Sequence, residues 1–323
     1  MSRAVFIRSH GGPEVLSLEE REVGLPGRGE IRIRNHAIGL NFIDTYHRSG
    51  LYKLDLPFVG GNEGAGEVTA VGEGVELWTV GDRVAYSGPP GAYADERLLP
   101  ADKAVAVPDG ISYEIAAAAL LKGTTAFYLI HWTHAVQPGD TVLVHAAAGG
   151  TGQILCQWAS AKGARVIGTA GSAEKLEIAL ANGCAAAINY REDDFVAQVR
   201  ELTGGRGVDV VYDGVGQATF EPSLDCLRSR GLMVSFGNAS GPVSIPNLGI
   251  LASKGSLYVT RPTSGAYFPT GKELREGAGA LFAAILAGDV RMSIEQRFPL
   301  ADIRQAHEAL ESRATSGQTV LLP

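Results

Sequence analysis

The pattern of hydrophobic and polar positions divides the chain into two kinds of segment. Residues 1 to about 123 hold short stretches of strand character between turns, and residues 30–34 alternate polar and apolar side chains as a half-exposed strand does. From residue 142 to about 259, apolar strands alternate with stretches of helical spacing. That alternation predicts an α/β fold whose doubly wound parallel sheet has helices on both faces.

Individual elements follow from the same patterns. Ser112 and Glu114 precede an alanine-rich run to Leu121, which predicts a helix with Ser112 at its start. A second helix is expected over residues 124–135. The remaining predictions are strands over 30–34, 67–72, 81–85, 141–144, 165–169, 208–212, 231–235 and 256–259, helices over 173–182, 192–202, 217–228, 273–286 and 302–313, and a short final strand.

The stretch from Thr141 to Gly152 is the most informative part of the sequence. A strand-length apolar run leads into a turn of small residues that contains Gly149 and Gly150, and helical apolar spacing follows. A dinucleotide pyrophosphate needs this order, because glycines let the backbone approach the phosphates and a helix start supplies N–H donors. Ala147 stands where the first glycine of G-x-G-x-x-G would be. The turn therefore predicts a dinucleotide site.

The strand that follows predicts which dinucleotide is bound. It ends about 20 residues beyond the turn, where such folds read the adenosine ribose, and an NAD site carries Asp or Glu there. This chain instead reads Gly171, Ser172 and Lys175, which offer space, a hydroxyl and a positive charge to a 2′-phosphate. We therefore expect NADPH rather than NADH. The alternative for Lys175 is an ordinary exposed helix lysine, and Glu174 fits the first turn of that helix.

Composition narrows the class of protein further. A length of 323 residues is typical of two domains. The net charge of −7 and the absence of a basic run leave nucleic-acid binding without its usual electrostatic driver. No apolar run approaches the length of a membrane helix. Three widely spaced cysteines, Cys156, Cys184 and Cys226, fit the reduced thiols of a cytoplasmic protein.

Several blocks of sequence resemble one family. The blocks that carry the likeness are residues 10–16, 39–46, 146–152, 188–192 and 233–238, and the likeness runs from residue 4 to residue 323. These blocks are similar to those of bacterial NADPH:quinone oxidoreductases, members of the zinc-free, zeta-crystallin-like branch of the medium-chain dehydrogenase/reductases.

This resemblance implies an arrangement of domains. A strand-rich, GroES-like substrate domain, residues 1–123 and 261–323, is split by a Rossmann NADPH-binding domain, residues 124–260. The cofactor is then expected in the cleft between the two domains. The family also implies a homodimer, formed by pairing the last Rossmann strand, residues 256–259, with its copy in a second chain, because an apolar edge strand favours such a partner.

No metal is expected at the site. Zinc-using relatives of the superfamily carry a cysteine where Asn41 stands, and a Gly-His-Glu where this chain reads Gly61-Asn62-Glu63. Catalytic zinc needs three good protein ligands and an open position, which these residues do not provide. His131 and His134 form the other candidate pair, and a surface or helix-packing position is the better interpretation of both, since no carboxylate or third histidine accompanies them.

The resemblance also assigns cofactor contacts to particular residues. Alternatives remain at several of them: loop capping at Asn41 and Asp44, surface packing at Tyr190, and a surface ion pair between Arg313 and Glu311. The implied contacts are Asn41, Asp44 and Lys122 at the nicotinamide end; Gly149, Gly150, Thr151, Gly152 and Gln153 at the pyrophosphate; Ser172, Lys175 and Tyr190 at the 2′-phosphate, beside Gly171; Phe236, Gly237, Ser240, Val259, Thr260 and Arg261 along the nicotinamide side; and Arg313.

Without a metal, catalysis depends on position and electrostatics. By resemblance Tyr46 and Tyr52 flank the substrate cleft, where their rings suit a quinone; ordinary packing is the alternative. The hypothesis is that C4 of NADPH delivers hydride while Asn41, Tyr46 or Tyr52 steadies the substrate oxygen and water supplies the final proton. One-electron transfer remains an alternative to hydride transfer.

Two other functions compete with quinone reduction. The same zinc-free site suits NADPH-dependent reduction of the double bond in an enal or enone, because hydride addition to the β-carbon also builds an oxyanion. A non-catalytic role, as a crystallin-like or RNA-binding protein, belongs to a different class. The glycine turn and the acidic charge balance favour catalysis over that role.

Overall fold

The computed structural model describes residues 1–312 and 315–323 and divides the chain into two compact units. The first, here called the mixed-sheet unit, comprises residues 1–124, 268–286 and 292–323. The second, the parallel-sheet unit, comprises residues 125–267 and 287–291. The sequence-based division, with a Rossmann domain over residues 124–260, stays a prediction.

Six parallel strands form the sheet of the parallel-sheet unit, in the order β11-β10-β9-β12-β13-β14. Numbered along the unit's own sequence, this order reads 3-2-1-4-5-6, which is that of a Rossmann dinucleotide-binding sheet. The predicted parallel sheet is therefore confirmed. Its strands are β9 (Thr141–Val144), β10 (Arg165–Ala170), β11 (Ala186–Asn189), β12 (Val208–Asp213), β13 (Leu227–Ser235) and β14 (Tyr258–Thr260).

Continuous apolar runs form these strands because a parallel sheet with helices packed against it buries both faces. Every residue of β9 and β12 is buried, and Leu143 and Val211 share one apolar core with Leu224 of a packing helix. The helices of this unit are α3 (Gly150–Ala161), α4 (Ala173–Ala181), α5 (Phe195–Leu202), α6 (Phe220–Cys226), α7 (Gly249–Ser253) and α8 (Ser264–Tyr267).

Two predicted helices of this unit are shorter in the structure. The helix expected over residues 192–202 begins at Phe195, because the Asp194 side chain caps it by accepting hydrogen bonds from the first backbone N–H groups. The helix expected over residues 217–228 ends at Cys226, where the chain turns directly into β13. Strand β11 has no counterpart among the predicted elements.

A seven-stranded sheet organises the mixed-sheet unit, with β15-β16-β3-β5-β6-β8 in order and β7 also paired with β3. A smaller sheet has the order β2-β1-β4. Strand β16 pairs with β3, so the end of the chain joins the sheet near its start. The strands are β1 (Ser2–Ile7), β2 (Leu16–Arg21), β3 (Glu30–Gly39), β4 (Phe58–Val59), β5 (Glu63–Val71), β6 (Arg83–Ser87), β7 (Glu96–Pro100), β8 (Ala104–Ala106), β15 (Ile294–Pro299) and β16 (Gln318–Leu322).

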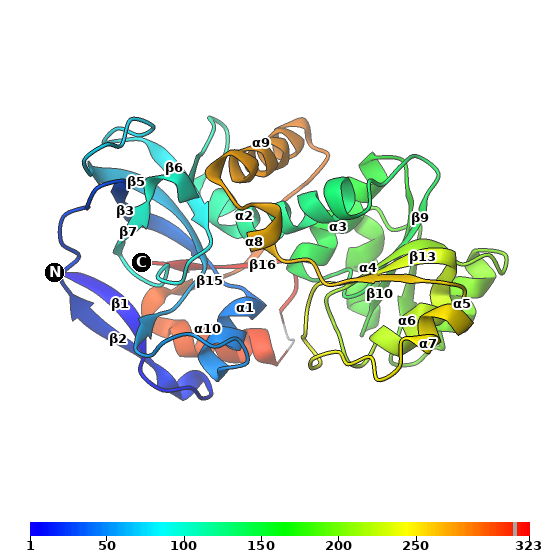
Figure 1. The fold of residues 1–323 in the computed structure, drawn as a ribbon. Helices are drawn as coiled ribbons and strands as arrows, with labels where there is room; N and C mark the ends of the chain where they lie inside the picture. The colour runs from blue at the N-terminus through cyan, green and yellow to red at the C-terminus, as the bar shows by residue number, and fades with distance from the viewer. Residues whose placement is uncertain (313–314) are drawn as a thin grey trace. The chain divides into compact units, whose positions relative to one another are not determined.

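Helix α1 follows β3 directly, and α10, near the end of the chain, lies beside it (Figure 1). The helices of the mixed-sheet unit are α1 (Phe42–Ser49), α9 (Gly271–Ala287) and α10 (Ile303–Glu311), with α2 (Tyr113–Tyr128) running from this unit into the next. Shorter helical turns are η1 (Pro13–Val15), η2 (Ala101–Lys103), η3 (Leu129–Thr133) and η4 (Leu300–Asp302).

Helix α2 corrects the expectation of two separate helices over 112–121 and 124–135. The chain continues helically through Gly123, although glycine is a poor helix former. The reason is packing: a Cβ atom on Gly123 would lie 2.4 Å from the side chain of Leu281 on α9. The predicted start is confirmed, because the Ser112 hydroxyl accepts a hydrogen bond from the Ile115 N–H.

Candidate functional site

The glycine turn lies at the carboxyl end of β9, where the neighbours of this strand are β10 on one side and β12 on the other. This is the position at which open α/β sheets bind their ligands. A Cβ atom on Gly152 would lie 2.2 Å from the backbone oxygen of Ala146. Only glycine allows the first turn of α3 to approach the loop so closely, so Gly152 gives the turn the close backbone packing of a dinucleotide-binding loop.

The start of α3 gives that loop its electrostatic character. Gly149 is the N-cap residue in extended conformation, and the N–H groups of a first helical turn have no carbonyl one turn earlier to bond. Together with the helix dipole they favour an anion. Gln153 has a different role, because its buried side chain donates a 2.9 Å hydrogen bond to the Ala148 oxygen and braces the loop.

His145 is a buried histidine that holds the loop after β9 in place, and the sequence analysis gave it no role. The Ser223 hydroxyl donates to the Thr219 oxygen at 2.5 Å, so it accepts from Nε2 of His145 at 2.7 Å. Nδ1 of His145 then accepts from the Thr169 hydroxyl at 2.8 Å. Burial lowers the pKa of His145, which favours the neutral imidazole that these bonds require. This residue ties β9 to β10 and α6.

The residues predicted for the 2′-phosphate gather at the start of α4. Ser172 is the N-cap, and its hydroxyl accepts a 3.4 Å hydrogen bond from the Lys175 N–H. A Cβ atom on Gly171 would lie 2.9 Å from the Tyr190 hydroxyl and 3.1 Å from Nε of Arg191. Arg191 thus adds a guanidinium that the sequence-based set omits, although it directly follows the predicted Tyr190.

Two further loops at the same edge of the sheet hold the remaining predicted residues of this unit. Asp213, fully buried at the end of β12, accepts the N–H groups of Val215 and Gly216 at 2.7 and 3.1 Å. The Ser240 hydroxyl donates to the Val215 oxygen at 2.8 Å, which joins the loops after β12 and β13. Ser240 therefore has a structural bond inside its own unit.

Close approach of two backbone segments explains why residue 237 is a glycine. A Cβ atom on Gly237, which follows Phe236, would lie 2.2 Å from the Gly214 oxygen. Arg261 donates from Nη1 to the Gly237 oxygen at 2.9 Å and to the Ser235 hydroxyl at 3.2 Å. Val259 and Thr260 lie in β14, immediately before Arg261. These residues form one loop cluster at the carboxyl ends of β13 and β14.

In the mixed-sheet unit, two of the three predicted nicotinamide-end residues, Asn41 and Lys122, bond a carboxylate that sequence reasoning gave no role. Glu63 has no exposed surface. Its Oε1 accepts from Nδ2 of Asn41 at 2.8 Å and from Nζ of Lys122 at 3.1 Å, while Oε2 accepts the Leu121 N–H at 2.7 Å. One carboxylate therefore holds the start of α1 and the middle of α2 against β5.

Asp44 is the second buried carboxylate of this cluster. It accepts hydrogen bonds from the Asn41 N–H at 2.9 Å, the Asn62 amide at 2.5 Å and the Tyr93 hydroxyl at 2.8 Å. Burial raises the pKa of Asp44 to about 6, and these three bonds act against that rise. The capping role considered for Asp44 is real, yet it accounts for only one of its three bonds.

Tyr46 and Tyr52 lie beside each other at the end of α1. Their rings meet edge to face with centroids 5.2 Å apart, and the Tyr52 N–H donates to the Tyr46 oxygen at 3.1 Å. Both side chains are half-buried. This arrangement offers a half-buried aromatic surface, and it also contains the packing contact that was the alternative for both residues.

Comparison with known proteins places this geometry in a family. The chain matches the "Zinc-binding dehydrogenase" family over residues 150–274 and the "Alcohol dehydrogenase GroES-like domain" family over residues 27–109. It is 52% identical to a quinone oxidoreductase of Pseudomonas aeruginosa and 51% identical to quinone oxidoreductase 1 of Escherichia coli, with 100% of each chain covered. The chain belongs to the quinone oxidoreductase family.

Solved structures agree with this assignment. The crystal structure of the Escherichia coli quinone oxidoreductase complexed with NADPH matches with a TM-score of 0.97, at 51% identity over 100% of both chains. A 2-haloacrylate reductase of Burkholderia is 47% identical over 100% of this chain and 99% of its own length. The expected family and the predicted GroES-like and Rossmann folds are thus confirmed.

The residues at the positions of the superfamily's zinc ligands do not fit a zinc ion. Asn41 and Asn62 present amides, which are not among the usual ligands of zinc, and both amides are hydrogen-bonded to carboxylates. His131 stacks on Phe127, and His134 pairs with Asp140. Among residues 1–312 and 315–323, no three or more His, Cys, Asp or Glu side chains gather to hold a metal.

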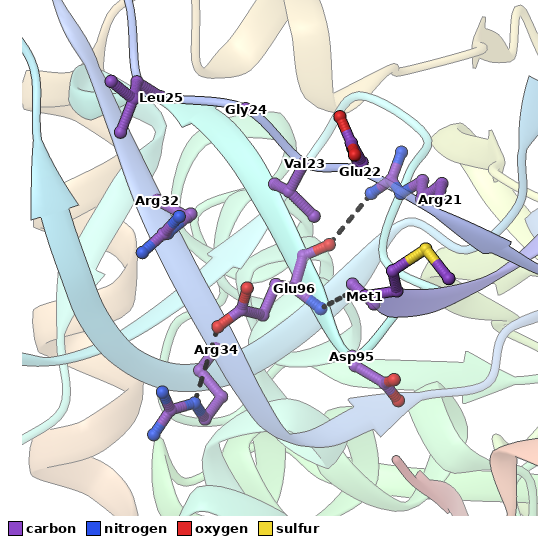
Figure 2. Close-up of a pocket in the computed structure, with 11 residues that line it drawn as sticks. Met1, Arg21, Glu22, Val23, Gly24, Leu25, Arg32, Arg34, Asp95 and Glu96 are labelled. Carbon is purple, nitrogen blue, oxygen red and sulfur yellow. Dashed lines mark hydrogen bonds and ion pairs between the residues drawn. The ribbon is translucent and has the colours of Figure 1, made fainter.

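One predicted residue, Arg313, and one surface groove are not part of the candidate site as the structure describes it. Arg313 lies outside the residues that the structure describes. A surface groove of about 650 Å³ on the mixed-sheet unit is lined by Arg21, Arg32 and Arg34 among others, with Arg34 paired to Glu96 (Figure 2). None of the predicted site residues lines this groove, so it is separate from the candidate site.

The geometry around Gly171 predicts how the family's cofactor preference is set here. If these residues hold the 2′-phosphate, Lys175→Ala and Arg191→Ala should each raise the KM for NADPH by about tenfold to a hundredfold, because each would remove a charged donor. The KM for NADH should stay unchanged. Steady-state kinetics with both cofactors measure this directly.

Arg165→Ala is the matched control, since it removes one positive charge from the opposite end of β10, where Arg165 bonds the Leu202 oxygen. It should leave both KM values unchanged. Equal increases for NADPH and NADH in Lys175→Ala would contradict the assignment.

Proposed function

We propose that this chain is a zinc-independent NADPH:quinone oxidoreductase. The observation that carries the proposal is the full-length match, at a TM-score of 0.97, to a quinone oxidoreductase complexed with NADPH. The chain's own geometry supports it. Gly152 lets the start of α3 approach the turn after β9, and Gly171 lets the Tyr190 hydroxyl and the Arg191 guanidinium approach the end of β10.

The residues at the end of β10 fit NADPH specifically. Gly171 and Ser172 follow the strand, and Glu174 lies within the first turn of α4, where an acid favours the helix dipole. Ser172, Lys175, Tyr190 and Arg191 are proposed to hold the 2′-phosphate. Bound NADPH supplies a hydride from C4 of its nicotinamide.

The other predicted contacts keep their proposed roles within each unit. Asn41, Asp44 and Lys122 are assigned to the nicotinamide end. The support is that Asn41 and Lys122 both donate to Glu63, and that the Asn41 N–H donates to Asp44. The pyrophosphate and the nicotinamide side are assigned to a larger set in the parallel-sheet unit. That set is Gly149, Gly150, Thr151, Gly152 and Gln153, then Phe236, Gly237, Ser240, Val259, Thr260 and Arg261.

Substrate reduction is proposed to depend on position rather than on a strong acid. The rings of Tyr46 and Tyr52 supply flat faces for a quinone, and their hydroxyls supply donors. The Asn41 amide nitrogen donates to Glu63 at 2.8 Å and more weakly to the Gly39 oxygen at 3.5 Å, and these two contacts orient the amide. A donor fixed in this way stabilises negative charge on the substrate oxygen without reorganising. Water then supplies the final proton.

A second candidate activity is reduction of an activated carbon–carbon double bond. The observation that favours it is the 2-haloacrylate reductase relative, at 47% identity over the whole chain. Both reactions place an oxyanion on the acceptor, so the same donors serve either one. The shape of the acceptor distinguishes them.

Location and assembly belong to the same proposal. All three cysteines are free and buried, which supports a reducing, cytoplasmic compartment. No helix in the described part of the chain is long and apolar enough to cross a membrane. Strand β14 is at the edge of its sheet, with Tyr258 61% exposed, which supports a homodimer built by pairing β14 of two copies.

An acceptor panel tests the proposed activity. NADPH oxidation should be fast with 1,4-benzoquinone and slow with a simple enone, and a metal chelator should change neither rate. Absorbance of NADPH measures both reactions side by side. Preference for the enone would move the activity to double-bond reduction, and loss of activity in chelator would contradict zinc independence.

Sedimentation tests the dimer. At micromolar concentration the chain should sediment as a dimer, and Tyr258→Arg should shift it toward monomer, because two like charges would face each other across the paired edge. A wild-type chain that sediments only as a monomer would contradict the assembly.

A further inference from the structure

A buried chain of hydrogen bonds lies behind Asp44, and the proposed function does not use it. The Tyr93 hydroxyl lies 2.8 Å from Oδ2 of Asp44 and 3.0 Å from Nε2 of His307. Nδ1 of His307 in turn lies 2.9 Å from Nη1 of Arg48. All four side chains are buried, and they come from α1, the segment before β7, and α10.

The chemistry of the groups gives this chain one direction. A guanidinium only donates, so Nδ1 of His307 accepts from Arg48. The neutral imidazole then carries its proton on Nε2 and donates to the Tyr93 oxygen. The hydroxyl proton of Tyr93 remains for Asp44. Every donor in the chain therefore points toward the Asp44 carboxylate.

Only the two end groups of this series of hydrogen bonds, Asp44 and Arg48, carry a charge. Burial, together with the neighbouring Arg48, lowers the pKa of His307 to about 3, and burial with the nearby Asp44 raises the pKa of Tyr93 well above its usual value. Both middle groups are thus neutral at ordinary pH. The chain connects a buried carboxylate, Asp44, to a buried guanidinium, Arg48, one turn later on the same helix.

Arg48 is itself held rigidly. Its Nε donates to the Gly11 oxygen at 3.1 Å, and its Nη2 forms a 2.6 Å ion pair with Glu311 of α10. Its third nitrogen serves His307. A side chain with all its nitrogens engaged cannot rotate without breaking several bonds, so it is a fixed anchor for the chain.

We propose that Tyr93, His307 and Arg48 are positioning residues that hold Asp44 as an ionised carboxylate of fixed orientation for the NADPH-dependent reaction. This series of hydrogen bonds does not deliver protons to Asp44, because it ends on the Arg48 guanidinium, which keeps its protons at any ordinary pH. The inference rests on the proposed function, in which Asp44 serves the nicotinamide end.

Several titratable or charged groups face Asp44 from the elements packed around it. Glu63 of β5 acts to raise the pKa of Asp44, and Lys122 of α2 pairs with Glu63. Asn62 bonds both Asp44 and His47 of α1, and burial lowers the pKa of His47. The Tyr93 hydrogen bond favours the charged form of Asp44, so removing it should shift the titration of Asp44 upward.

The first test is Tyr93→Phe. If ionised Asp44 is needed, kcat/KM for NADPH falls as pH drops through about 6, and the variant moves this acid limb upward by about one pH unit. Tyr86→Phe is the matched control, because Tyr86 is equally buried and its hydroxyl bonds Asn35 at 2.8 Å rather than Asp44. The control should leave the acid limb in place.

A second pair of variants separates positioning from packing. His307→Gln retains one donor and one acceptor and should keep the wild-type acid limb, whereas His307→Leu removes both and should shift it as Tyr93→Phe does. An unmoved limb in Tyr93→Phe and His307→Leu, with only a uniform loss of rate, would overturn the inference and leave these residues a structural role.

Unfolding free energy as a function of pH gives a readout that needs no cofactor. The pKa of Asp44 rises from 3.8 to about 6 on burial, so the folded state binds the proton more tightly and stability falls as pH rises through that window. In Tyr93→Phe the fall should extend to higher pH than in wild type or Tyr86→Phe. Coinciding profiles would overturn the inference, whereas a wild type without NADPH oxidation would contradict only the proposed function.

Discussion

The burial of the Glu63 carboxylate is the constraint on which the rest of the candidate site depends. A charge without exposed surface is stable only where enough donors surround it. Glu63 finds them in the Asn41 amide, the Lys122 ammonium and one backbone N–H of α2. Satisfying this one group therefore fixes the start of α1 and the adjoining turn of α2 together.

The same principle recurs around each of the other polar groups of the site. Asp44 is balanced by donors that lead back to Arg48, and Asp213 is held by the N–H groups of its own loop. His145 links two hydroxyls as a neutral group. Where the backbone itself must approach closely, at Gly152 and Gly237, glycine removes the steric obstacle. Fixed dipoles and close backbone approach are what catalysis by position and electrostatics requires of a protein.

The parallel sheet could be predicted because short stretches of sequence specify its strands and the turn that follows β9. Strands buried on both faces read as continuous apolar runs, and the turn to α3 has its own glycine pattern. Helix α2 could not, since Gly123 resembles a break and only the distant Leu281 explains it. The cofactor positions came from family resemblance, and the dinucleotide turn and the residues beside Gly171 came from the pattern itself.

The buried partners of the site gave no comparable signal. Glu63 bonds Asn41 from 22 residues away, Tyr93 bonds Asp44 from 49, and His307 bonds Arg48 from 259. Such pairs depend on the fold of the whole unit, and no periodicity or spacing in the sequence reports them. Arg191 was missed for a different reason: its guanidinium lies beside the end of β10 only because Gly171 has no side chain to obstruct it.

A double-mutant cycle on Glu63 and Lys122 tests the central claim most directly. Glu63→Gln should lower the free energy of unfolding by about 3–5 kcal/mol, because it leaves the Lys122 charge buried without its partner. Adding Lys122→Met should restore most of that loss, which denaturant unfolding of the four proteins would measure. Additive losses in the double variant, or a Glu63→Gln chain as stable as wild type, would contradict the account.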